Sequence, residues 1–180
     1  MPSSFTLHHP TEDDWAAIRD LRIRMVTDTP IAFLETREEA LAHDDAHWRE
    51  RGRRNAAGPG TYVVAVDPDG RWVGAMVGIV STGSPDYVAE PRAGDERANL
   101  VGVFVDPEWR GAAGVTDALL GDVLAWARNS GFGDLYLHVS DANARAIRSY
   151  EKRGFVRTGV VDTIPGREDD LQIEMVLALA

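Results

Sequence analysis

The chain has 180 residues, close to the usual size of one domain, and carries a formal net charge of -10. Its 44% hydrophobic and 27% charged residues are typical of a globular protein. No apolar run approaches the roughly 20 residues that a membrane-spanning helix needs. The acidic charge opposes nucleic-acid binding, because that binding depends on cations that neutralise phosphates. We therefore expect one domain over residues 1–180, without nucleic-acid or membrane partners.

Two further features concern compartment and chemistry. The absence of cysteine excludes disulfides, thiolate metal sites and a cysteine nucleophile. The first residues, Met1 to Phe5, do not combine a basic region with an apolar stretch as an export signal does, so we expect a cytoplasmic protein. An acidic surface attracts cationic substrates, but negative charge also serves solubility, and both interpretations stay open.

The predicted elements begin with a short strand over residues 3–9. A capping box at Thr11 then opens a helix whose apolar face includes Trp15 and Leu21. A second capping signature predicts a weakly amphipathic helix over residues 36–54, which we expect to lie on the surface because most of its residues are charged.

The middle of the chain has the pattern of a β-hairpin. Runs of β-branched and aromatic residues at 62–66 and 72–80 flank a turn that ends at Gly70. A polar, Gly- and Pro-containing stretch over residues 82–94 predicts a surface loop, and residues 97–105 form the next predicted strand.

The last third alternates between helix and strand periodicity. The predicted elements are a helix at 113–129, a strand at 135–139, a helix at 141–153, and strands at 155–162 and 171–179. The whole order is β-α-α-β-β-β-α-β-α-β-β. It predicts an α/β (α+β) domain in which helices cover a sheet of about seven strands.

One pair of histidines has a spacing that metal ligands use. His43 and His47 are four residues apart, but Asp44 stands where the HExxH motif has glutamate. We therefore interpret the pair as part of a polar helix face and expect no metal site.

The most informative segment, residues 103–116, runs from a strand through small residues into a helix. Small side chains allow close approach to the backbone, and the first amides of a helix are unpaired donors, so a pyrophosphate fits there. Arg110 adds a cationic group. The same Gly/Ala-rich turn is also typical of tight packing between a helix and a sheet, and the segment alone leaves both interpretations open.

A second segment resembles motif B of the GNAT acetyltransferase superfamily, V-x-x-x-N-x-x-A-x-x-x-Y-x-x-x-G-F. The matching residues are Val139, Asn143, Ala146, Tyr150, Gly154 and Phe155. Upstream, the run from Val105 to Gly111, VDPEWRG, is similar to motif A, V-x-P-x-x-R-G-x-G-x-G/A. Two motifs in order and register are more specific than either alone.

The resemblance implies a GNAT-type mixed, mostly antiparallel sheet with helices on both faces. It implies an N-acetyltransferase that binds acetyl-CoA as cosubstrate and transfers the acetyl group to an amine by direct attack on the thioester. The acceptor would be a small-molecule amine or a peptide N-terminus. Residues 25–54 and 82–97 are expected to shape the acceptor pocket, and the chain is expected to act as a monomer or a homodimer.

The resemblance also assigns roles to residues. The cofactor-binding residues would be Val103, Val105, Arg110, Gly111, Ala112, Ala113, Gly114, Val115, Thr116 and Asn143. Tyr150 would be the general acid that protonates the leaving thiolate. Asn143 as a helix cap and Tyr150 as a core aromatic are the structural alternatives.

Two departures from the family pattern affect these assignments. Motif A is one residue longer than usual, which places Gly114 late and puts Thr116 where the pattern has Gly or Ala. Asn99 stands where some members carry a glutamate base, so Glu96 is named as a candidate base or lining residue beside a water relay. A non-catalytic acyl-CoA-binding module is therefore the alternative function.

Overall fold

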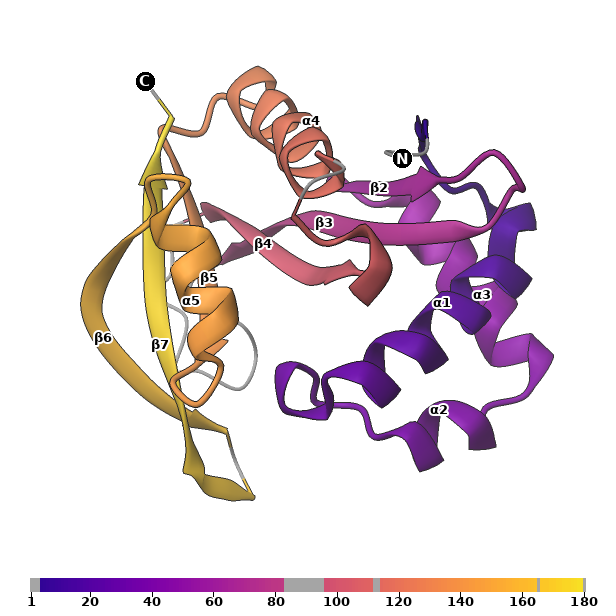
Figure 1. The fold of residues 1–180 in the computed structure, drawn as a ribbon, viewed down its shortest axis with the longest axis horizontal. Helices are drawn as coiled ribbons and strands as arrows, with labels where there is room; N and C mark the ends of the chain where they lie inside the picture. The colour runs from indigo at the N-terminus through magenta and orange to yellow at the C-terminus, as the bar shows by residue number, and fades with distance from the viewer. Residues whose placement is uncertain (1–3, 83–95, 112–113, 165, 180) are drawn as a thin grey trace. The chain divides into compact units, whose positions relative to one another are not determined.

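The computed structural model describes residues 4–82, 96–111, 114–164 and 166–179. Its elements are β1 (Thr6–His8), η1 (Glu12–Asp14), α1 (Trp15–Asp28), η2 (Pro30–Ala32), α2 (Arg37–Ala42), α3 (Asp45–Ala57), β2 (Thr61–Val66), β3 (Trp72–Thr82), β4 (Glu96–Val105), η3 (Pro107–Trp109), α4 (Val115–Asn129), β5 (Asp134–Ser140), α5 (Ala144–Glu151), β6 (Val156–Ile164) and β7 (Arg167–Ala178). Figure 1 labels the α-helices and the strands β2 to β7. Within these described ranges, no helix combines the length and hydropathy that a bilayer crossing requires.

The strands form one seven-stranded sheet in the order β1-β2-β3-β4-β5-β7-β6. The pairs β1/β2, β2/β3, β5/β7 and β6/β7 are antiparallel, whereas β4 and β5 are parallel. The predicted fold class and the number of strands are therefore confirmed. The predicted hairpin is also confirmed, with Gly70 in the left-handed region at the turn.

Compact packing divides the chain into two units. The first comprises residues 1–78 and 102–126, and the second comprises residues 79–101 and 127–180. The long strands β3 and β4 contribute residues to both units. The expectation of a single domain over residues 1–180 stays a prediction.

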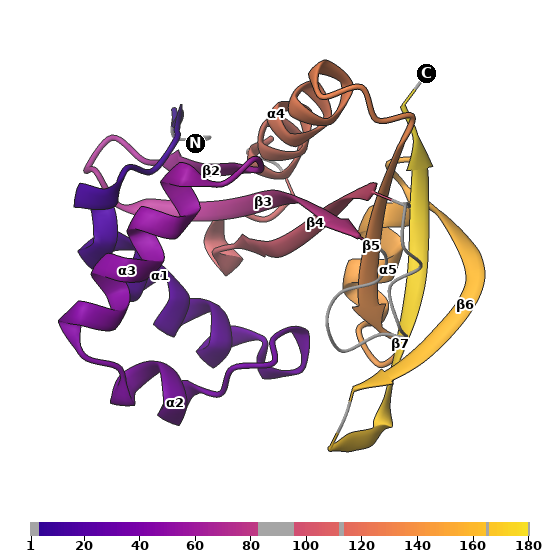
Figure 2. The ribbon, with the colours of Figure 1, turned by 180° about the vertical axis from the view of Figure 1, so that it is seen from behind.

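In the first unit, helices cover both faces of the sheet. α1 and α3 lie on one face (Figure 2), where Ile18, Leu21 and Met25 of α1 share a core cluster with Trp48 of α3. On the opposite face, α4 approaches Gly74 so closely that an added Cβ there would lie 3.0 Å from the Leu119 side chain. Small residues in the strand therefore allow α4 to seat on the sheet.

The predicted helix over residues 36–54 is wrong in one respect. It is divided into α2 and α3, because Asp44 caps a new helix by accepting a hydrogen bond from the His47 amide at 2.9 Å. The two helices do lie on the surface, since most of their residues are exposed. Trp48 is fully buried and anchors α3 in the core.

In the second unit, α5 lies against β5 and β7 (Figure 1). Leu135, Leu137 and Val139 alternate along β5 and are buried, and Ile147 and Phe155 are buried with them. The opposite face of the same strands carries polar side chains. The predicted loop over residues 82–94 lies, apart from Thr82, outside the described residues.

Candidate functional site

The strand that precedes the small-residue loop loses its neighbour partway along. β4 pairs with β5 at Ala98↔Leu135 and Asn99↔Tyr136, the only two pairs recorded between these strands within the described ranges. Among the described residues, the backbone groups of β4 beyond Leu100 have no recorded pair with β5. Such groups are able to bind an extended ligand in the way that an added strand would.

The loop after β4 is folded by local chemistry. Pro107 opens the 3-10 turn η3, and Trp109 is buried with its ring edge-on to Phe5. Gly111 and Gly114 both have positive φ angles, 88° and 71°, that other residues rarely adopt. Ala112 and Ala113, predicted as cofactor-binding, lie outside the described residues.

Helix α4 begins at Val115, directly after Gly114. At this end of the helix, the first backbone hydrogen bond runs from the Ala118 amide to the Gly114 carbonyl at 3.0 Å. The amides of Val115 and Thr116 precede it and lie in the first turn, where helices have donors without intrahelical partners. This end of α4 therefore offers donors to an anion.

Sequence reasoning missed the residue that holds the loop in place. Asp106 is buried, and its Oδ2 accepts from Arg24 at 2.6 Å and lies 2.9 Å from an Arg71 nitrogen. Its amide donates to the Val73 carbonyl at 2.8 Å. Asp106 thus ties the start of the loop to α1 and to the β2/β3 hairpin.

Arg110 has a bracing role that its predicted cationic role did not include. Its Nε donates to the Val105 carbonyl at 2.7 Å, and its guanidinium pairs with Asp28. The Val105 carbonyl is therefore already occupied. Val103 is partly buried and has no such contact recorded among the described residues.

In the second unit, Tyr150 lies in the last turn of α5 with its ring 5.6 Å from that of Phe155. Burial raises the pKa of the Tyr150 hydroxyl well above its ordinary value of 10.0, since the phenolate would lose its hydration; nearby Arg153 opposes this more weakly. The hydroxyl is therefore protonated at neutral pH and able to donate a proton.

Asn143 is the cap of α5, since its Oδ1 accepts a hydrogen bond from the Ala146 amide at 3.2 Å. This is the structural alternative that the sequence left open. Among the described residues, only the oxygen of this side chain has a recorded hydrogen bond, and the cofactor role stays a prediction.

The two β4 residues considered for the base differ in setting. Glu96 is exposed at the start of β4. Asn99 is buried and its amide donates to Ser81 Oγ at 2.7 Å. A positive φ of 60° interrupts β4 at Gly102, so the strand irregularity lies six residues beyond Glu96. The role of Glu96 stays a prediction.

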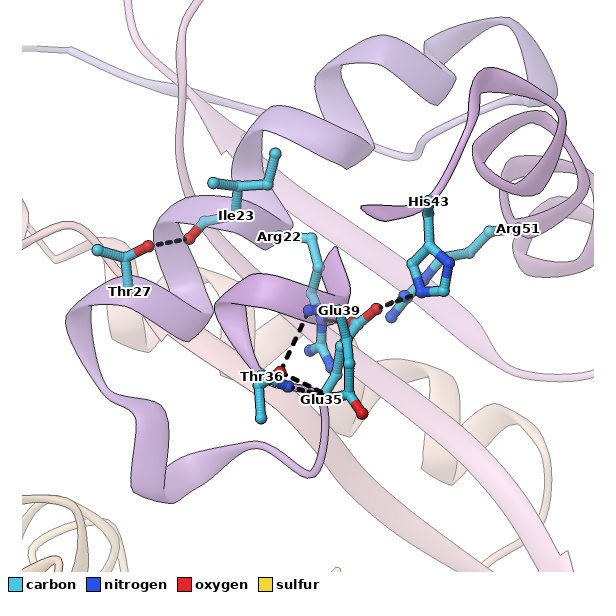
Figure 3. Close-up of polar contacts among 8 residues, drawn as sticks. All are labelled: Arg22, Ile23, Thr27, Glu35, Thr36, Glu39, His43 and Arg51. Carbon is cyan, nitrogen blue, oxygen red and sulfur yellow. Dashed lines mark hydrogen bonds and ion pairs between the residues drawn. The ribbon is translucent and has the colours of Figure 1, made fainter. Parts of the chain in front are cut away.

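The predicted histidine pair does not lie on one helix face, because His43 precedes α3. Its ring instead stacks on that of His47 with centroids 3.5 Å apart. Together with Glu35 the pair has ligand atoms within 4.8 Å of one another. Figure 3 shows Glu35 between Arg22 and His43; its Oε2 lies 2.6 Å from Arg22 Nε and 3.3 Å from Arg51. Two arginines on one carboxylate oppose a metal cation there, and the expected absence of a metal stays a prediction.

Comparison with known proteins agrees with this geometry. The sequence model of the acetyltransferase (GNAT) family matches residues 15–155, and the chain belongs to this family. A probable N-acetyltransferase family 8 member 5 from Mus musculus is 37% identical over 86 residues, 48% of this chain and 36% of that protein. The chain thus matches about a third of the length of this curated relative.

Solved structures show the same fold. A nourseothricin acetyltransferase has 29% identity and a TM-score of 0.56, over 68% of this chain and 66% of that one. A GNAT superfamily phosphinothricin acetyltransferase from Sinorhizobium meliloti, solved in complex with AcCoA, has 20% identity and a TM-score of 0.71, over 100% of this chain and 90% of that one.

Proposed function

We propose that the protein is an N-acetyltransferase that moves the acetyl group of acetyl-CoA to an amine. Family membership supports this proposal, and so does the AcCoA bound by the structural relative from Sinorhizobium meliloti. One observation supports the proposal most strongly. The part of β4 beyond its pairs with β5 leads into a loop with Gly111 and Gly114, and this loop ends at the N-terminus of α4.

The first unit would hold the cosubstrate. The backbone of Val103 would pair with the pantetheine arm and thioester, while amides from Gly111 to Thr116 would bind the pyrophosphate. Motif A contains one extra residue, and α4 begins at Val115. The phosphate site would therefore be centred on the amides of Val115 and Thr116. Val105 would contact pantetheine through its amide or side chain, since its carbonyl accepts from Arg110.

The family resemblance assigns Tyr150 a part in the chemistry. The amine attacks the thioester carbonyl directly, the carbon–sulfur bond breaks, and the sulfur leaves as a thiolate. Tyr150 would donate its proton to that sulfur, since burial raises the pKa of its hydroxyl and keeps it protonated at neutral pH. No covalent enzyme intermediate is required.

An acceptor screen with detection of free thiol tests the proposal. Polyamines, aminoglycosides, amino acids and peptide N-termini form the panel, because all present an amine. Release of CoA that depends on one acceptor class supports the transferase. Tight acetyl-CoA binding without release across the panel supports the acyl-CoA-binding module. The cytoplasmic setting and the monomeric or homodimeric state stay predictions.

A further inference from the structure

The first unit contains a half-buried cluster of cationic side chains. Arg22 of α1 and Arg51 of α3 both reach the carboxylate of Glu35, which lies between η2 and α2 (Figure 3). The side chains of Arg22 and Arg51 are only 14% and 26% exposed, and that of Glu35 is 14% exposed. Two guanidinium charges thus share one carboxylate in a partly desolvated place, which leaves one positive charge in excess.

Both oxygens of the Glu35 carboxylate are already engaged. Oε2 accepts from the two arginines, and Oε1 lies 3.0 Å from His43 Nε2. Burial lowers the pKa of Arg22, and the charge of Arg51 lowers it further, while Glu35 raises it. The two guanidinium groups are therefore close enough to repel each other, and a second anion beside them would relieve this repulsion.

Several donors of this cluster are free to bind a ligand. Among the described residues, the recorded hydrogen bonds of Arg22 use only its Nε, and those of Arg51 use only its Nη1. Each guanidinium therefore has further N–H groups without a partner. None of these remaining nitrogens belongs to the side-chain atoms that are both buried and unpartnered in the described ranges. Solvent reaches them, and a small ligand is able to do the same.

Tyr62 of β2 adds an uncharged donor. Burial raises the pKa of Tyr62 to about 12, and the charges of Arg51 and Arg22 oppose this rise, so the hydroxyl lies within range of both guanidinium groups. Outside the sheet ladder, the one hydrogen bond recorded for Tyr62 uses its backbone carbonyl and not its hydroxyl. The hydroxyl is also not among the buried unpartnered atoms of the described residues. It is therefore protonated at neutral pH and accessible.

Aromatic rings fix the orientation of the two guanidinium groups. Arg22 Cζ lies 4.8 Å from the centre of the Phe33 ring, and Arg51 Cζ lies 5.5 Å from that of Trp48. Phe33 and Trp48 are themselves buried in the core cluster. The cationic donors are thus held in place before a ligand arrives, which lowers the entropic cost of binding.

We propose that Arg22, Arg51 and Tyr62 form a binding site for an oxyanion, a carboxylate or a phosphate group that a small ligand carries. The two arginines would donate charge-assisted hydrogen bonds through their remaining N–H groups, and the Tyr62 hydroxyl would donate a further bond. Glu35 positions the two guanidinium groups. The same positive charges that oppose a metal cation at Glu35 thus favour an anion beside it.

Two sources of the oxyanion fit this chemistry. The first is the carboxylate of the acceptor itself, as in an amino acid, and this source rests on the proposed function. The second is a separate small anion that binds apart from the reaction. The site is the same in both cases, so binding tests the inference and acceptor kinetics identify the source.

The direct test is a calorimetric titration of the protein, saturated with acetyl-CoA, with inorganic phosphate and with succinate. The cosubstrate occupies the phosphate site expected at α4, so the probes report on the cluster. Arg51→Gln should weaken the binding of both probes by roughly 10-fold or more, because a charge-assisted hydrogen bond is lost. Arg53→Gln is the matched control, since it makes the same charge change on the same helix at a side chain that is 66% exposed and paired with Glu50. It should change affinity by less than about 2-fold.

Tyr62→Phe tests the site with no change in charge and with the ring retained in the core. We expect it to weaken binding of both probes by about 3- to 10-fold, the effect of one neutral hydrogen bond. This variant keeps the inference testable even where Arg51→Gln folds poorly, because the ion pairs of Glu35 stay intact.

Steady-state kinetics with an amino acid and with its carboxamide identify the source. An increase in KM for the amino acid alone in Arg51→Gln assigns the oxyanion to the acceptor. Unchanged KM for both acceptors, together with weakened phosphate binding, assigns it to a separate anion.

Two results overturn the inference. One is wild-type protein that binds neither probe in a saturable way, and the other is equal affinity for the probes in Arg51→Gln, Tyr62→Phe and Arg53→Gln. Failure of the proposed function is a different result, because it appears as no thiol release with any acceptor while both probes still bind with the same order among the variants.

Discussion

Arg24 Nη1 lies 2.6 Å from Asp106 Oδ2, and the same guanidinium donates through Nη2 to the Trp72 carbonyl at 2.6 Å. Arg24 and Asp106 are 82 positions apart in the sequence, yet their ion pair joins α1 to the start of the loop after β4. The loop that should hold the pyrophosphate is therefore anchored to the helical part of its own unit. Its conformation depends on a buried charge as well as on its glycines.

Asp106→Asn should destabilise the protein by about 2 kcal/mol, less than the 3–5 kcal/mol typical of breaking a buried pair, because both arginines partly reach solvent. Urea unfolding measures the change. Glu108→Gln removes an exposed partner of Arg71 and should shift stability by less than about 0.5 kcal/mol. Equal effects in the two variants would contradict the anchoring role.

Gly78→Ala should destabilise the first unit by about 1–3 kcal/mol, because an added Cβ would lie 2.5 Å from the Trp126 ring. Gly121→Ala is the control, since its Cβ meets nothing within 4 Å in α4 and should stabilise the helix by up to about 1 kcal/mol. Thermal unfolding distinguishes them. Opposite signs are expected, and a stable Gly78→Ala would show that α4 does not seat on β3.

Glu35 should make stability depend on acid pH. Burial by itself would raise the pKa of Glu35, but hydrogen bonds and charge from Arg22 and Arg51 outweigh it and hold this pKa below the ordinary 4.5. The carboxylate therefore contributes stability that is present above about pH 4.5 and lost as the pH falls further.

Unfolding of Glu35→Gln across pH measures that contribution. The stability difference from the wild type should be largest near neutral pH and should shrink below pH 4.5. The exposed Glu38→Gln serves as the control. A difference that is constant with pH would show that the two arginines do not stabilise the Glu35 charge.

Gly114→Ala should weaken acetyl-CoA binding by roughly 10-fold, because forcing a left-handed conformation on alanine costs about 1–2 kcal/mol and the loop would relax. Gly131→Ala imposes the same backbone strain at the other end of α4, where φ is 83°. Titration calorimetry on both variants measures affinity. An equal loss of acetyl-CoA affinity in both variants would show that the effect comes from overall stability and not from the loop.

Tyr150→Phe should lower kcat by roughly 10²-fold and leave acetyl-CoA affinity nearly unchanged, because the ring still packs on Phe155 but the proton donor is lost. Steady-state kinetics with a saturating acceptor measures the change. Unchanged turnover would exclude Tyr150 as the acid and would favour its alternative role as a core aromatic.

The sequence predicted the elements best where periodicity was strong. The hairpin, α1, α4 and all seven strands lie close to their expected ranges, since apolar alternation and capping residues act locally. The break before α3 was missed because Asp44 was interpreted as a helix residue and not as a cap.

Only those site residues that belong to the two family motifs could be predicted from the sequence. Residues 103–116 and 139–155 carry the family pattern, so the loop and Tyr150 were found directly. Asp106 was not, because its partners Arg24 and Arg71 come from a distant helix and from the β2/β3 hairpin.

The most direct measurement follows a labelled acetyl group from acetyl-CoA to the acceptor amine while the released CoA thiol is counted. The proposed function predicts label in an amide product, with one thiol released for each acetyl group transferred, at a rate that Tyr150→Phe reduces. Label that stays on bound acetyl-CoA with every acceptor tested would contradict it and would leave a protein that binds acyl-CoA without catalysis.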